Sequence, residues 1–206
     1  MGLFGLSKEI KEQIEEELKV VLCSGFFSEL SILVRAQDTI EEICEENEVR
    51  MPSERYCLSL LKKIKKKYAV SGKNENFNRL HNVFSQLNQE NIIAIHYADC
   101  EKLALSVVYE EMQRIEKVGG ITEGYCYYGE YELETVLDKQ ILRLTYGSHN
   151  ASETQVREKI GNRVVELLRE QGFEAEMTEG IAGEIQIHNF VWDKVYDDKK
   201  YAGKCD

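Results

Sequence analysis

A histidine, an aspartate and a cysteine lie close together where a predicted strand hands over to a predicted helix. They are His96, Asp99 and Cys100. The N-terminus of a helix stabilises negative charge, so a thiolate or a bound anion would be favoured there. However, the spacing His-x-x-Asp-Cys matches no strong catalytic motif. The simpler interpretation makes Asp99 the N-cap of the helix, His96 a strand residue and Cys100 part of the first helical turn.

Aromatic and acidic side chains are concentrated in the segment from residue 125 to 149. A tyrosine-lined sheet can stack a planar ligand or anchor a protein partner, and a core whose hydroxyls reach its rim would explain the same residues. Glu130 and Glu134 would share one face of a short helix and could form a carboxylate pair, although such glutamates are usually only solvated. The candidate residues for binding a ligand or partner are His96, Asp99, Tyr125, Tyr128, Glu130, Tyr146 and His149.

The sequence predicts no metal, cofactor or catalytic residue. Its four histidines include no HxH or HExxH pair, and its six cysteines include no CxxC pair. A disulfide framework is typical of smaller secreted chains, so we expect buried, reduced thiols, with Cys205 as the exposed exception. Apolar runs are far shorter than the roughly 18 residues of a membrane span, and the start of the chain does not resemble a secretory signal. These features predict a soluble cytoplasmic protein.

Charge is distributed unevenly along the sequence. The net charge is -11 overall, with -7 in residues 1–50, +5 in residues 51–90 and -9 in residues 91–206. An acidic chain repels phosphate backbones, so general nucleic-acid binding is not expected. No membrane partner is expected either, because the apolar runs are short. The exception to the acidic charge is a basic patch on a predicted helix, which is either a solvated face or a surface that meets acidic residues of this chain or of a second copy. Its residues are Lys62, Lys63, Lys65, Lys66 and Lys67.

Hydrophobic periodicity predicts an α+β fold. Residues 1–90 form a helical region of about four helices, and residues 91–206 form an α+β domain with a polar C-terminal tail from residue 193. In the second predicted helix, one stripe at helical spacing consists of Leu30, Leu33, Val34, Gln37, Ile40 and Cys44. The α+β domain is expected to contain a mostly antiparallel sheet of about five strands and three helices.

The C-terminal half resembles a bacterial domain family of unknown function. The resemblance rests on a Gly-Tyr-aromatic strand, a strand that ends in Tyr-Gly, an Ile-Gly helix and a last strand that ends near a tryptophan. These are Gly124-Tyr125 with Tyr127-Tyr128, Leu142 to Gly147, Ile160-Gly161 and Trp192. The family has a His- and Asp-containing cluster after the aromatic strand, where this chain reads Gly129-Glu130-Tyr131-Glu132. The resemblance therefore implies a fold and no activity.

Two classes of function remain open on these grounds. The first is a non-catalytic protein-interaction module, which has an unknown protein partner or associates with itself. The alternative is an enzyme or a small-ligand-binding protein that uses a cleft near His96, Asp99, Tyr128 and His149. A pocket joining those four residues would favour the alternative.

Overall fold

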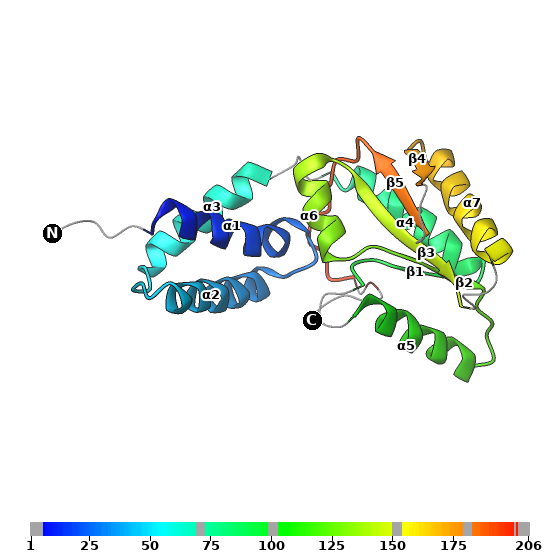
Figure 1. The fold of residues 1–206 in the computed structure, drawn as a ribbon, viewed down its shortest axis with the longest axis horizontal. Coiled ribbons are helices and arrows are strands. Elements are labelled where there is room, and N and C mark those ends of the chain that lie inside the picture. The colour runs from blue at the N-terminus through cyan, green and yellow to red at the C-terminus, as the bar shows by residue number, and fades with distance from the viewer. Residues whose placement is uncertain are drawn as a thin grey trace. The chain divides into compact units, whose positions relative to one another are not determined.

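The computed structural model describes residues 6–68, 73–98, 103–149, 154–178, 183–199 and 201. The chain divides into two compact units, which are shown in Figure 1. The first comprises residues 1–72 together with the short segment 194–197, and the second comprises residues 73–193 and 198–205.

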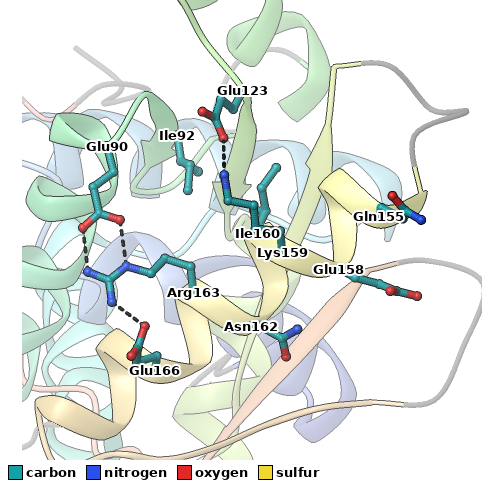
Figure 2. A pocket seen from close by; sticks show the side chains of 10 residues that line it. All are labelled: Glu90, Ile92, Glu123, Gln155, Glu158, Lys159, Ile160, Asn162, Arg163 and Glu166. Atoms are coloured by element: carbon teal, nitrogen blue, oxygen red, sulfur yellow. Dashed lines mark hydrogen bonds and ion pairs between the residues drawn. The ribbon is translucent and has the colours of Figure 1, made fainter.

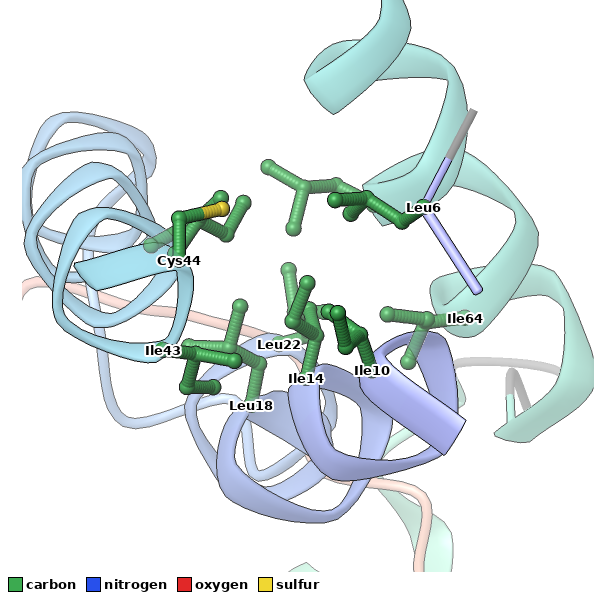
Figure 3. Packing of buried hydrophobic residues seen from close by; sticks show 11 residues of the cluster. Leu6, Ile10, Ile14, Leu18, Leu22, Ile43, Cys44 and Ile64 are labelled. Atoms are coloured by element: carbon green, nitrogen blue, oxygen red, sulfur yellow. The ribbon is translucent and has the colours of Figure 1, made fainter. Parts of the chain in front are cut away.

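The first unit is a bundle of three helices, α1 (Lys8–Cys23), α2 (Glu29–Glu46) and α3 (Glu54–Tyr68). Serine side chains cap the first two helices: Ser7 accepts a hydrogen bond from the Ile10 N–H, and Ser28 accepts one from the Ser31 N–H. Both α2 and α3 pack on α1. Figure 3 shows the core that they enclose, whose buried members are Leu6, Ile10, Ile14, Leu18, Leu22, Ala36, Ile40, Ile43, Cys44, Leu61 and Ile64.

The second unit is built on a five-stranded sheet with the order β1-β2-β3-β5-β4. The strands are β1 (Ile92–Ile95), β2 (Gly124–Tyr127), β3 (Leu142–Ser148), β4 (Glu174–Met177) and β5 (Glu184–His188). Strands β1 and β2 are parallel, and the other three pairs are antiparallel. The predicted α+β class, with a mostly antiparallel sheet of five strands, is confirmed.

Four helices of this unit cover the sheet: α4 (Glu75–Gln89), α5 (Ala104–Lys117), α6 (Glu130–Lys139) and α7 (Thr154–Glu170). Helix α5 packs over Ile93 and Ile95 of β1 through Val108, and α4 and α7 contact each other as well as the sheet. The sequence placed α4 with the N-terminal helices, whereas the contacts place it with the sheet. The reason is that its buried stripe, which includes Phe84 and Leu87, belongs to the core of the second unit.

Side chains block the backbone at both edges of the sheet. On β1, the Asn88 amide donates to the carbonyl of Ala94 at 3.2 Å, and its oxygen accepts from the Ala94 N–H at 2.9 Å. On β4, Arg169 Nε donates to the carbonyl of Ala175 at 3.0 Å. Open strand edges template pairing with other chains, so these contacts oppose association through the sheet.

The C-terminal segment is not a uniformly polar tail. Asp193 and Tyr201 are buried, although their surroundings in the sequence are polar. The Asp193 carboxylate accepts hydrogen bonds from the N–H groups of Asn76 and Phe77 in the first turn of α4, both at 2.9 Å. The residue before this helix, Asn74, has a left-handed φ of 54° and makes no side-chain cap of its own. Asp193 therefore supplies the cap from a distant part of the sequence.

Candidate functional site

Three polar side chains form a hydrogen-bonded chain at one end of the sheet. His96 follows β1 and Tyr128 follows β2, and these strands are parallel, so both residues lie at the same end. His96 Nδ1 lies 2.8 Å from the Tyr128 hydroxyl, and His96 Nε2 lies 3.1 Å from Nδ1 of His81 on α4. Sequence reasoning missed His81. Its spacing from Phe77 and Phe84 places it on the inner face of the helix and could have identified it.

Aromatic rings enclose this His81–His96–Tyr128 chain. Phe84 stacks on the His96 ring with centroids 4.4 Å apart, and Tyr201 meets it edge-on at 5.4 Å. His96 is only 4% exposed, and Tyr128 is fully buried. Burial raises the pKa of the Tyr128 phenol well above its ordinary value of 10.0. The phenol therefore stays protonated at neutral pH and acts as a hydrogen-bonding group rather than a base.

The backbone next to this chain of side chains is strained. Tyr97 is buried and has a φ of 53°, which is uncommon for a residue with a bulky side chain. The next residue, Ala98, donates its N–H to the Tyr128 carbonyl at 2.9 Å. Residues held in the left-handed backbone region by such contacts are common at functional sites.

The structure does not bring His149 together with His96 and Tyr128. Ser148 pairs with Gly124 at the start of β2, so His149 lies at the end of the sheet opposite Tyr128. Burial lowers its pKa, an effect that Glu116 partly offsets. Within the described part of the chain, its Nε2 has no hydrogen-bond partner. Asp99, the fourth residue of the predicted cleft, lies outside the described residues, as does Cys100.

The remaining predicted residues are spread over the sheet. Tyr125 stacks with Tyr127 on the face covered by α5. Tyr146 lies against α7, and its hydroxyl is 3.4 Å from the sulfur of Met177. Glu130 is the first residue of α6. The tyrosines thus line both faces of the sheet, and they do not form a single aromatic platform.

A second polar region, shown in Figure 2, forms a groove of about 920 Å³ beside α7. Arg163 donates through Nε and Nη2 to the Glu90 carboxylate, with both distances 2.7 Å, and it also pairs with Glu166. The Arg163 guanidinium lowers the pKa of Glu90. Lys159 lies 3.4 Å from Glu123. These charged side chains already form ion pairs with one another, so none of them is left to bind a charged ligand.

The first unit carries an apolar groove of about 570 Å³ between α2 and α3. Leu30 on α2 and Leu58 on α3 line it and are 73% and 38% exposed. Leu33 and Val34 are also exposed, at 47% and 52%. The sequence pattern placed Leu30, Leu33 and Val34 on the same apolar stripe of α2 as Ile40 and Cys44. Instead, the residues that face the core are Ala36, Ile40, Ile43 and Cys44.

The predicted basic patch lies on α3, and all five of its lysines are exposed. Lys67 forms an ion pair with Glu15 of α1, and the Tyr68 hydroxyl donates to the same carboxylate at 2.8 Å. One end of the patch therefore meets acidic surface inside the first unit. An exposed pair of this kind contributes little to stability.

Two further observations bear on the class of protein. Among the described residues, no group of three or more His, Cys, Asp or Glu side chains is placed to hold a metal ion. None of the helices in the described ranges combines the length and apolar character needed to cross a bilayer.

We predict that Tyr128→Phe destabilises the second unit by about 1–3 kcal/mol, because it leaves the buried His96 Nδ1 without its partner. Trp192 is the sole tryptophan of the sequence, and its ring centroid lies 5.7 Å from that of Tyr128, so its fluorescence during urea denaturation reports this unit. Tyr131→Phe is the matched control. Tyr131 is exposed, and its replacement should stay within about 0.5 kcal/mol of the parent. Equal stability of the two variants would show that the His96–Tyr128 hydrogen bond does not stabilise the second unit.

Comparison with known proteins places the chain in a family. A family model described as Domain of unknown function (DUF6891) matches residues 7–196. The match covers both units, so it extends beyond the C-terminal half in which the sequence resemblance was found. No curated protein and no solved structure matches the chain. On the extent of the family match, the chain belongs to the DUF6891 family.

Proposed function

We propose that this protein is a non-catalytic protein-interaction module of the bacterial cytoplasm. The observation that carries the proposal is the apolar groove between α2 and α3. Leu30, Leu33 and Val34 recur at helical spacing, yet the structure leaves them exposed beside the groove lining of α3. Monomeric proteins rarely expose contiguous apolar surface unless it binds a partner or a ligand.

The chemistry of the groove suits a protein better than a small polar molecule. Its lining is mostly aliphatic, with Gln37 and Glu54 as its polar members. Grooves of this type bind the apolar face of an amphipathic helix. The four described cysteines are free thiols, which agrees with a reducing compartment.

The rival proposal is an enzyme or small-ligand-binding protein that uses the His81–His96–Tyr128 chain. The observation in its favour is a pair of imidazoles in hydrogen-bond contact, because histidines in contact can relay a proton. Against it, His96 and Tyr128 are closed in by aromatic rings, and His149 lies at the opposite end of the sheet. We therefore place it second.

Site-specific photo-crosslinking in living cells tests the interaction module. We expect a photoreactive phenylalanine analogue at Leu58 to give an adduct with a protein. The same analogue at Val118, which is exposed on the second unit, should give none. If both positions give the same products, or neither gives any, the groove is not a binding surface and the proposal fails.

A further inference from the structure

We infer that the partner of the α2–α3 groove is a second copy of this chain, bound across a two-fold axis. This inference rests on the proposed function, because it names the occupant of the same groove. The opposite charges at the two ends of the groove favour this occupant.

The groove is apolar in the middle and oppositely charged at its ends. Helix α2 leads into α3 through the short connection of residues 47–53, and Cys44 is close enough to Cys57 to affect its pKa. The C-terminal part of α2 and the N-terminal part of α3 therefore share one end of the groove. At that end, residues 38–55 carry seven carboxylates and two arginines.

The opposite end of the groove is basic. It is formed by the first turns of α2 and the last turns of α3, where residues 29–35 and 62–67 together carry one carboxylate and six cationic side chains. On α3, Lys62 and Lys65 follow Leu58 at helical spacing, so they continue the surface that lines the groove. On α2, Asp38 follows Val34 and Glu41 follows Gln37 at the same helical spacing, so these two carboxylates also continue the surface that lines the groove.

A two-fold axis across the helices turns the groove end for end. Two copies facing each other through this axis bring the acidic end of each onto the basic end of the other, while the apolar centres meet. An axis along the helices would instead oppose like charges. Isologous interfaces of this self-complementary kind are the commonest in homo-oligomers. Side-chain contacts to the backbone of Ala94 on β1 and Ala175 on β4 oppose association through the sheet edges.

Paired charge-reversal variants of the full chain test the arrangement. One variant carries Asp38→Lys and Glu41→Lys, which reverses the charge of the two acidic side chains that continue the groove surface on α2. The other carries Lys62→Glu and Lys65→Glu, which reverses the charge of the two basic side chains that continue the groove surface on α3. In light-scattering and sedimentation series over concentration, we expect the parent to dimerise and each variant alone to dimerise at least about tenfold more weakly. An equimolar mixture of the variants should recover the dimer. At about 1 M salt the screening length falls to about 3 Å, so the separate variants should regain part of their self-association.

The apolar centre is tested by Leu58→Glu, with Val118→Glu as the matched control on an exposed site of the second unit. Leu58→Glu should abolish the dimer, Val118→Glu should leave it intact, and both should retain the helical circular dichroism of the parent. A parent chain that stays monomeric throughout the series overturns the inference, as does a mixture of charge variants that fails to associate.

The experiments distinguish a failure of the self-association inference from a failure of the proposed interaction module. If the purified chain is monomeric but the photoreactive residue at Leu58 captures a different protein in cells, self-association is wrong and the interaction module stands. If the chain is monomeric and no adduct forms, both are wrong.

Discussion

Replacing Asp193 with alanine is expected to destabilise the second unit by about 2–3 kcal/mol, since it leaves two N–H groups at the start of α4 without their acceptor. The carboxylate accepts both hydrogen bonds at 2.9 Å and is buried, so water cannot fully replace it. The negative charge also lies at the positive end of the helix dipole. Urea denaturation followed by Trp192 fluorescence measures the change, because this neighbouring residue is buried in the same unit.

Two further variants separate the cap from general effects of substitution. Asp193→Asn keeps the shape and one acceptor oxygen, so its stability should fall between those of the parent and Asp193→Ala. Glu170→Ala removes an exposed carboxylate from the end of α7 and should change stability by no more than about 0.5 kcal/mol. A loss for Asp193→Ala no larger than that of Glu170→Ala would mean that the helix does not depend on this cap.

The Asp193 cap shows why part of the fold could not be predicted from the sequence. Elements whose pattern is local were found: the amphipathic helices from their apolar spacing, and β5 from its alternation of Ile185 and Ile187 with polar residues. A cap supplied from 117 positions away leaves no local signal. The polar composition after residue 192 therefore predicted a tail, although Asp193 is buried because its carboxylate bonds to a helix end.

The stripe on α2 was misjudged for a different physical reason. Leu30, Leu33, Val34 and Ile40 all fit one apolar helix face, but the face of α2 that is buried in the core is centred on Ala36, Ile40 and Ile43 instead. The structure turns Ile40 toward α1 and leaves the leucines and the valine exposed. Periodicity alone identifies apolar surface without saying whether the chain itself or a partner covers it.

The candidate site was predicted only in part. His96 was selected where a predicted strand hands over to a helix, and Tyr128 was selected from a tyrosine-rich segment. The parallel pairing of β1 and β2 brings them together. His149 was grouped with them in the predicted cleft. The antiparallel direction of β3 carries it to the other end of the sheet. Strand direction is a property of topology, which the spacing of residues did not determine.

The residues that carry the family resemblance have a structural explanation in this chain. Gly124 begins β2 and pairs across the sheet with Ser148, beside Gly147 of the Tyr-Gly strand end. A Cβ added at Gly124 would lie 2.2 Å from the carbonyl oxygen of Gly147 and 2.4 Å from Cδ1 of Ile160 on α7. The Gly-Tyr, Tyr-Gly and Ile-Gly motifs therefore meet where α7 approaches the β2–β3 pair. In this structure these motifs allow close packing of α7 on the β2–β3 pair.

Gly124→Ala is accordingly expected to destabilise the second unit by about 3 kcal/mol or more, at the upper end of the range for overpacked cores. One of the two contacts is with backbone, which can move only if β2 and β3 separate. Loss of that pairing should appear as faster hydrogen exchange at the amides of Tyr127 and Thr145, which are opposite each other in the register, whereas the Tyr146 N–H points away from β2 and donates to the Gly183 carbonyl.

Gly119→Ala provides the comparison within the same unit. A Cβ at Gly119 would meet nothing within 4 Å, so that variant should suffer only the strain of its φ of 80°, about 1 kcal/mol. Adding Ile160→Ala to Gly124→Ala relieves the side-chain contact but not the backbone contact, and the double variant should remain less stable than Ile160→Ala alone. If Gly124→Ala proves as stable as Gly119→Ala, the β2–β3 pair has room for a side chain, and close packing does not account for the glycine.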